Sequence, residues 1–385
     1  MLFIKNGHIK TMAGQEIQKG SILVGDDGKI ISVTAGDVWT APTGATVIDA
    51  GVRLVTPGCI DAHCHVGLDN EGCGWEGHDY NEIVDPITPQ MRAIDSINPM
   101  DEGLANALKG GVTSACTGPG SANVVGGTFA AIKLYGKRVD RMVIQQSVAM
   151  KCAFGENPKR CYGQNGKKAP MTRMGTAALL RELLFKTQRY LQDKEAGKNP
   201  GFDMKLEAMI PVIQGKLPLK AHAHRADDIF TAIRIAKEFG LKITLDHCTD
   251  GSLIADELAQ EGLWTFVGPT LGNKSKIELV NKSFSTPANL HTAGVKLCII
   301  TDAPVIPLQY LPMCAGLAAK SGLPVEEAWK AITINPATAL GIADRVGSLE
   351  PGKDADIVIW TADPLESIGG EAWMTIVDGK PVYQA

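Results

Sequence analysis

The 385-residue sequence has no long apolar run and no excess of charge of one sign. No segment approaches the roughly 20 apolar residues that a membrane-spanning helix needs. Lysine and arginine number 38 against 42 aspartate and glutamate residues, which gives a net charge of -4. This balance offers no basic field for nucleic acid. We therefore expect neither a membrane nor a nucleic acid as a partner.

Cysteine is present, but its arrangement disfavours a disulfide framework and a thiolate zinc site. The nine cysteines are odd in number and scattered, and no two of them form a CxxC pair. We expect most of them to be small buried residues. The first residues, MLFIKNGHIK, lack the charged, apolar and small-residue zones of a signal peptide. The sequence therefore predicts a cytoplasmic protein.

The two ends of the chain share a hairpin signal that the middle lacks. Asp27-Gly28 and Asp378-Gly379 each lie between β-branched runs and suit the φ > 0 positions of a tight turn. From 57 to 342, short apolar runs alternate instead with helical stretches, which favours right-handed βαβ units and a parallel sheet. Seven strands are clear, and the eighth is either TFAAIKLY or a segment near 205–214.

An α/β fold of this length suits a closed (β/α)8 barrel of the TIM type. A doubly wound sheet is the alternative. It is weakened because no GxGxxG motif follows the first strand of the alternating region.

Histidine and aspartate end several of the expected strands. The residues in these positions are His63, His65, His222, His224, His247 and Asp302. Parallel barrel strands deliver their carboxyl ends to one rim, so these side chains should converge. Residues i and i+2 of a strand face the same way, so His63 and His65 can point together while Cys64 points away. Imidazoles and a carboxylate at one rim predict a divalent metal site, zinc being the ion that fits best.

Each of these residues also has a structural explanation. A single HxH pair on a strand is a weak signal, but only His8, His78 and His291 lie away from predicted strand ends. For His224 we favour packing or a hydrogen bond to a metal ligand over ligation, because one histidine per strand usually suffices at this position. Asp302, just before Ala-Pro, resembles a helix N-cap. A cap would not explain why three other strands also end in metal-binding side chains.

The segment TPGCIDAHCH resembles the signature PGxIDxHxH of the metal-dependent amidohydrolase superfamily. KAHAH, LDH, TDAP and the late segment VGSLEPGKDADIVIW follow in the order typical of that superfamily, and the subgroup is similar to imidazolonepropionase-like and prolidase-like members. The resemblance implies a barrel over 57–342 and a small β-sandwich domain made from 1–56 and 343–385. It also implies one or two metal ions at His63, His65, His222, His247 and Asp302.

Many members of this superfamily carry a further bridging ligand, and two residues compete for that role here. A glutamate is an ionised oxygen donor without modification, whereas a lysine must first be carboxylated. We therefore favour Glu156 over Lys151 as the bridging ligand.

The resemblance implies hydrolysis of a C–N bond in a small molecule, such as an amide, a cyclic amide, an N-acyl amino acid or a dipeptide. Asp302 would act as general base and then general acid. His224 is a candidate to stabilise the oxyanion, and so is His247 if only one metal ion binds. A deaminase on the same barrel is an alternative, and a catalytically inactive scaffold is a second.

Substrate selectivity is expected from the loops after the first strands, at 67–80, 119–127 and 153–166. Arg225 and the pair Lys159-Arg160 are candidates for binding a substrate carboxylate, although surface basic residues are common. The sequence leaves the oligomeric state open, including a homo-oligomer.

Overall fold

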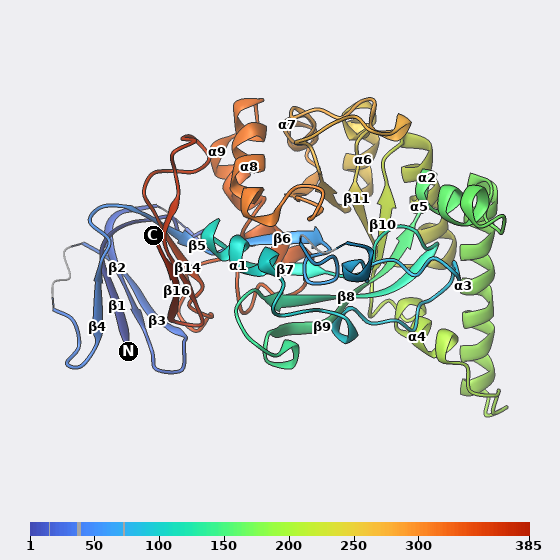
Figure 1. Ribbon diagram of the computed structural model, residues 1–385, viewed down its shortest axis with the longest axis horizontal. Helices are drawn as coiled ribbons and strands as arrows, with labels where there is room; N and C mark the ends of the chain where they lie inside the picture. The colour runs from blue at the N-terminus through green and yellow to red at the C-terminus, as the bar shows by residue number, and fades with distance from the viewer. Residues whose placement is uncertain (15, 37–39, 72–73) are drawn as a thin grey trace.

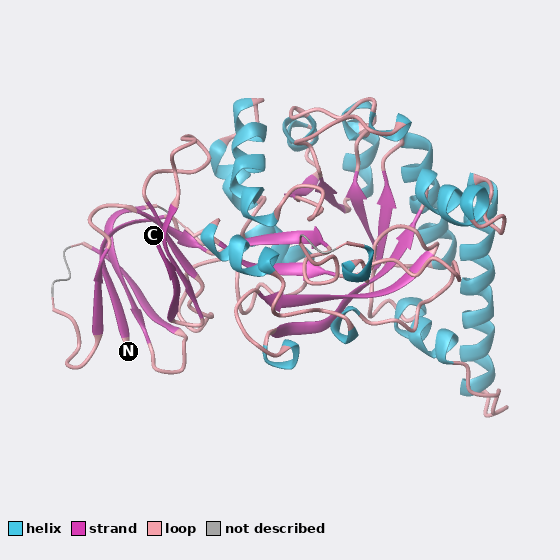
Figure 2. Ribbon diagram, in the orientation of Figure 1, coloured by secondary structure: helices cyan, strands magenta, loops and turns pink. Residues whose placement is uncertain are grey.

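The computed structural model describes residues 1–14, 16–36, 40–71 and 74–385. It contains two eight-stranded sheets (Figures 1 and 2). One is built from both ends of the chain, and the other is built from the middle of the chain. Among the described residues, no helix is both long and apolar enough to cross a bilayer.

The first sheet joins the two ends of the chain, and both termini lie in it (Figure 1). Its strands are β1 (Leu2–Ile9), β2 (Ile17–Val24), β3 (Ile30–Ala35), β4 (Thr46–Asp49), β5 (Leu54–Pro57), β14 (Ile357–Trp360), β15 (Ala372–Val377) and β16 (Lys380–Gln384). The order is β16-β15-β14-β5-β1-β2-β3, with β4 beside β1. Both expected hairpins are confirmed, since β2 pairs with β3 and β15 with β16 in antiparallel fashion. Its apolar side chains form a core of their own. The exact domain boundaries and the β-sandwich stay predictions.

The second sheet is the barrel. Its strands are β6 (Cys59–Cys64), β7 (Val112–Thr117), β8 (Val125–Lys133), β9 (Val143–Ala153), β10 (Leu219–Ala223), β11 (Ile243–His247), β12 (Trp264–Val267) and β13 (Lys296–Ile299), in sequence order around the sheet. The two edge strands are tied by Asp61 of β6, whose Oδ2 accepts hydrogen bonds from Thr301 N at 2.9 Å and Thr301 Oγ1 at 2.6 Å, just after β13. The barrel is therefore nearly closed.

The eighth strand is the TFAAIKLY candidate, but it does not run as predicted. Strand β8 is antiparallel to both β7 and β9, and the rival segment forms helix α4 (Met204–Ile213). A parallel return needs a crossover of a dozen or more residues. The connections at 118–124 and 134–142 are shorter than that, so the chain turns back on itself. The expectation of an all-parallel sheet was wrong at this strand.

The helices cover the outside of the barrel (Figure 2). Besides α4 they are α1 (Glu102–Lys109), α2 (Glu156–Pro158), α3 (Arg173–Glu195), α5 (Ala226–Phe239), α6 (Ala255–Glu261), α7 (Thr286–Thr292), α8 (Leu311–Lys320), α9 (Val325–Lys330) and α10 (Ile334–Ala339). Sequence signals set several ends. Asp101 accepts from Gly103 N at 3.1 Å at the start of α1, and α5 ends at Gly240, which has the left-handed conformation that favours glycine.

The cysteines behave as expected where they can be compared. Seven of the eight described cysteines are buried, Cys161 is partly exposed, and all eight are free thiols. Cys73 lies outside the described residues.

One buried ion cluster links the barrel to the terminal sheet. Lys133 Nζ, at the end of β8, lies 2.6 Å from Asp356 Oδ2, 3.1 Å from Asp354 Oδ2 and 3.2 Å from Asp378 Oδ1. Burial alone would lower the pKa of Lys133, but the three carboxylates outweigh it and raise that pKa. A buried charge needs its partners, so this lysine should fasten the two parts together.

We expect Lys133→Met to lower the free energy of unfolding by about 3–5 kcal/mol, because it leaves buried carboxylates without their central cation. Urea unfolding measures this. Lys29→Met is the matched control: Lys29 also pairs with Asp354 but is more exposed, and its loss should cost about 1 kcal/mol or less. Equal effects of the two substitutions would contradict the linking role of Lys133.

Candidate active site

Three strand ends bring the predicted residues to one rim of the barrel. His63 belongs to β6 and His65 follows it, His222 belongs to β10, and His247 is the last residue of β11. Asp302 Oδ1 lies 3.3 Å from both His63 Nε2 and His65 Nε2. The predicted convergence of the HxH pair with Asp302 is therefore found in the structure.

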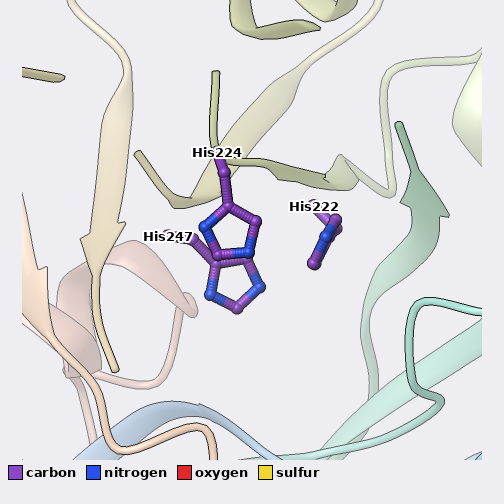
Figure 3. Close-up of side chains that lie close together, drawn as sticks. All are labelled: His222, His224 and His247. Carbon is purple, nitrogen blue, oxygen red and sulfur yellow. The ribbon is translucent and has the colours of Figure 1, made fainter. Parts of the chain in front are cut away.

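The histidine rings form a continuous cluster. Two groups have ligand atoms within 4.8 Å of one another: His63, His247 and Asp302, and His222, His224 and His247. His224 stacks on His247 with a centroid separation of 4.5 Å, and His222 meets both rings at steep angles (Figure 3). His247 thus belongs to both groups.

Hydrogen bonds on Nδ1 leave the opposite nitrogen of two rings free. His65 Nδ1 lies 2.7 Å from Gly118 O, and His247 Nδ1 lies 2.7 Å from Gly268 O. A carbonyl oxygen only accepts, so each Nδ1 carries the proton and each Nε2 keeps its lone pair. This arrangement is typical of histidine that ligates metal through Nε2.

Burial lowers the pKa of His63, His222, His224 and His247 and so favours the neutral form, which is the form that binds metal. Burial lowers the pKa of His222 and of His224 well below the usual range, and the neighbouring His247 adds to the effect. Burial also lowers the pKa of His63, although Asp246 opposes it. For Asp302, burial opposes ionisation, but His247, His63 and His65 outweigh it and hold the pKa of that carboxyl well below its usual range.

Two of these residues have a backbone conformation that side chains rarely adopt. His247 has φ of 75° and Asp302 has φ of 56°. Such a conformation costs about 1–3 kcal/mol and persists only where the surroundings enforce it. His247 is the last residue of β11, and Asp302 follows the end of β13, so both conformations occur where the chain leaves a barrel strand. The N-cap explanation for Asp302 is less apt, because no helix begins at the next residue.

Below the rim, a buried charge network supports His63. Asp246 Oδ2 lies 2.8 Å from Lys151 Nζ and 3.3 Å from His63 Nδ1, and Asp246 Oδ1 lies 2.9 Å from Lys220 Nζ. All four side chains are buried. Lys151 is therefore an ion-pair partner of Asp246 in this structure.

The structure places Glu156 away from the two histidine groups. Glu156 Oε1 accepts from Glu278 N at 3.2 Å, and Glu156 N donates to Glu278 Oε2 at 3.1 Å. Glu156 is not among the side chains that form the two groups of possible metal ligands in the described part of the chain, and its role as bridging ligand stays a prediction. The other oxygen of Glu278, Oε1, lies instead 3.9 Å from His222 Nε2 and 3.8 Å from His224 Nε2.

A cavity of about 590 Å³ opens over these residues. All five histidines expected at the metal site or in catalysis line it together with Asp302, and so do residues of all three predicted loops. The loop residues are Tyr80 from 67–80, Gly120, Ser121 and Ala122 from 119–127, and Asn157, Arg160, Cys161, Asn165 and Gly166 from 153–166. Residues 72–73 of the first loop lie outside the described residues.

Of the predicted cationic residues, only Arg160 lines the cavity. Arg225 is paired with Asp227, with two hydrogen bonds of 3.0 Å. Sequence reasoning missed Lys276, which also lines the cavity, and Glu278 beneath it. Their segment follows β12, so its place after a barrel strand was the signal that pointed to this rim.

The amidohydrolase family matches residues 54–382, and this chain belongs to that family. It is a hydrolase that acts on carbon–nitrogen bonds. The family assignment agrees with the signature around His63 and His65 and with the barrel described above.

The chain is similar to several known proteins. It is 29% identical to the amidohydrolase tasK of Hapsidospora irregularis, over 89% of this chain but only 38% of that protein. It is 24% identical to an imidazolonepropionase of Rhizobium rhizogenes, over 93% of this chain and 90% of that protein. The crystal structure of an amidohydrolase from Thermotoga maritima shares 38% identity over the whole of both chains, with a TM-score of 0.95.

Proposed function

We propose that this protein is a metal-dependent amidohydrolase that cleaves the C–N bond of an amide, cyclic amide, N-acyl amino acid or dipeptide carrying a carboxylate. The observation that supports it best is the meeting of His63, His65 and Asp302 at 3.3 Å, at the floor of a cavity. Similarity to a relative named imidazolonepropionase makes a cyclic amide the first substrate to test.

The residues present fit a divalent cation. His63, His65, His247 and Asp302 would hold it, since His63 Nε2 is buried without a hydrogen-bond partner among the described residues and the Nε2 atoms of His65 and His247 are left free by their Nδ1 bonds. Neutral imidazoles with a carboxylate are the donors that zinc prefers. Such a cation makes water a better nucleophile near neutral pH and polarises a carbonyl oxygen.

Asp302 is the residue placed to move the proton. Its side chain is 15% exposed, in contrast to the almost fully buried His63, and it lines the cavity. Because its pKa is held low, it is an ionised acceptor that can take a proton from the attacking water. It can then deliver that proton to the leaving nitrogen.

His224 lines the same cavity, and its Nδ1 lies 2.7 Å from Thr249 Oγ1. This bond fixes the ring with Nε2 directed away from Thr249. The prediction that His224 stabilises an oxyanion requires Nε2 to donate, which in turn requires that Nδ1 accepts the Thr249 hydroxyl proton.

The polar wall of the cavity favours an anionic substrate. Arg160 and Lys276 both line it, as does the carboxylate of Asp302. A guanidinium can bind a carboxylate through two parallel hydrogen bonds. We infer that Arg160 binds the substrate carboxylate while the scissile bond lies over Asp302.

We expect Arg160→Ala to raise KM about 10- to 100-fold with a smaller change in kcat, because a charge-assisted hydrogen bond contributes about 1.5–3 kcal/mol. Steady-state kinetics measures both constants. Arg225→Ala is the matched control, since Asp227 already holds Arg225 outside the cavity. Equal KM values for the two variants would show that Arg160 does not bind the substrate carboxylate.

The proposed function is tested by metal analysis together with a substrate panel. Zinc-loaded protein should hydrolyse at least one of 4-imidazolone-5-propionate, N-acyl amino acids, dipeptides or lactams, and a chelator should abolish the activity. The amide analogues of the same compounds, which lack the carboxylate, should be poorer substrates. Release of ammonia from an amidine carbon would point to a deaminase instead. No turnover of any compound by metal-loaded protein would contradict the proposal.

A further inference from the structure

An apolar groove lies apart from the active-site cavity, with which it shares no lining residue. Its volume is about 850 Å³, and it is formed where helices α1 and α8 meet the last strands of the chain, β14 to β16 (Figure 1). Large apolar side chains make up much of its lining. They include Tyr310, Met313, Leu317, Trp360, Leu365 and Ile368.

Three of these side chains are open to solvent. The exposed fraction is 95% for Ile368, 42% for Tyr310 and 38% for Met313. Single exposed apolar residues are common on protein surfaces, but a group of them beside a hollow is typical of an interaction site. The face therefore combines a projecting apolar side chain with an apolar hollow.

The turn that carries Ile368 is held in place by hydrogen bonds around Asp363. The carbonyl oxygen of Asp363 accepts from Glu366 N at 3.2 Å and from Ser367 N at 2.9 Å. The Asp363 side chain accepts from Trp329 Nε1 at 3.3 Å. Because an ordered turn loses little conformational entropy on binding, a side chain that it presents is suited to a contact with another molecule.

The charges around the groove are separated by sign. Lys109 and Lys320 lie on helices α1 and α8, whereas Glu366 and Glu371 lie on the segment between β14 and β15. All four side chains are exposed. Lys109 Nζ donates to Asn106 Oδ1 at 2.9 Å, and none of the four forms an ion pair with a described residue. The groove thus has cations on its helical side and anions on the other side.

This separation of charge makes the surface complementary to itself. In an isologous dimer the same surface of both copies meets, so that residue i contacts residue j and j contacts i. A two-fold axis along the groove would place the lysines of one copy opposite the glutamates of the other. A partner with one sign of charge would instead leave one side of the groove facing a like charge.

We propose that this groove is the interface of a homodimer, in which Ile368 of each copy packs into the groove of the other and the lysines meet the glutamates across the axis. An apolar centre with a charged rim is the usual anatomy of such an interface. The proposal does not depend on the proposed function, since none of these residues lines the active-site cavity.

Sedimentation velocity of the full chain at micromolar concentration tests the apolar contact. Wild-type protein should sediment as a dimer, and Ile368→Asp should raise the dimer Kd at least about 30-fold, as loss of a central interface residue does. Ile277→Asp is the matched control, because Ile277 is 77% exposed but does not line the groove. It should remain a dimer. Circular dichroism checks that both variants are folded.

Charge reversal tests whether the partner is a second copy. The double variant Lys109→Glu with Lys320→Glu has only anions around the groove, and Glu366→Lys with Glu371→Lys has only cations. Each double variant alone should be monomeric, because like charges then face each other. An equimolar mixture of the two at low salt should form a dimer with one copy of each variant.

Three results would overturn the proposal. A monomeric wild-type protein would remove the dimer, and an undisturbed dimer of Ile368→Asp would place the interface elsewhere. A mixture of the two charge variants that stays monomeric would contradict the pairing of lysines with glutamates. Binding of an apolar dye to a monomeric wild-type protein, lost in Ile368→Asp, would show that the groove receives another occupant.

Discussion

Asp302→Asn should lower kcat by at least about 100-fold while most of the metal stays bound. The amide keeps an oxygen that can face His63 and His65, but it cannot take up a proton from the attacking water. Because the carboxyl of Asp302 is ionised in the folded protein, its loss removes the general base and not merely a contact. Substrate turnover and elemental analysis on the same protein sample separate the two effects.

Asp227→Asn is a suitable control for this substitution. Asp227 is an exposed carboxylate at the start of α5 that pairs with Arg225, so the same chemical change there should leave kcat unaltered. Near-normal activity of Asp302→Asn would exclude Asp302 from the mechanism. Loss of all metal in that variant would show instead that Asp302 acts mainly as a ligand.

Replacement of both His63 and His65 by alanine is expected to release the metal ion that these two histidines would hold and to abolish activity. A ligand that binds only the folded state at about 100 times its Kd stabilises that state by about 2.7 kcal/mol. Wild-type protein should therefore lose thermal stability when a chelator is added. The double variant should unfold at a lower temperature from the start and show little further response to the chelator.

His291→Ala serves as the comparison, because His291 lies on α7 outside the cavity. It should bind metal like the wild-type protein and keep the response to chelator. If the double variant binds as much metal as the wild-type protein, His63 and His65 are structural residues and not metal ligands. The pair would then owe its position to the buried Asp246 network.

The strand-end residues were predictable because they depend on local periodicity and on one rule of topology. Apolar runs that end in His63, His222 or His247 mark barrel strands, and barrel strands bring their ends to one rim. The meeting of His63 and His65 with Asp302 at one rim follows from these two facts. The alternation of residues along a strand also predicted that Cys64 points away from His63 and His65. This is confirmed, since Cys64 Sγ is buried against Cys116 O.

The direction of β8 could not be predicted from the sequence pattern, although TFAAIKLY was recognised as a candidate strand. Residue patterns show that a segment is extended and buried, but not whether it runs up or down the barrel. The length of the connections decides this, and 118–124 is too short for a parallel return. Strand boundaries in a sequence are uncertain by a few residues, so the connection length was not known well enough.

What the sequence by itself determined is the family signature, the barrel with its added terminal strands, and the rim on which His63, His65, His222, His247 and Asp302 meet. Tertiary structure alone brought two carboxylates together beside this rim. Glu156 and Glu278 are 122 residues apart in the chain, and either could be a ligand by composition. Each carboxylate accepts a hydrogen bond from the other's backbone amide, and the second oxygen of Glu278 is buried beside two histidines. Unpaired buried atoms arise from packing between distant segments, which no local pattern records.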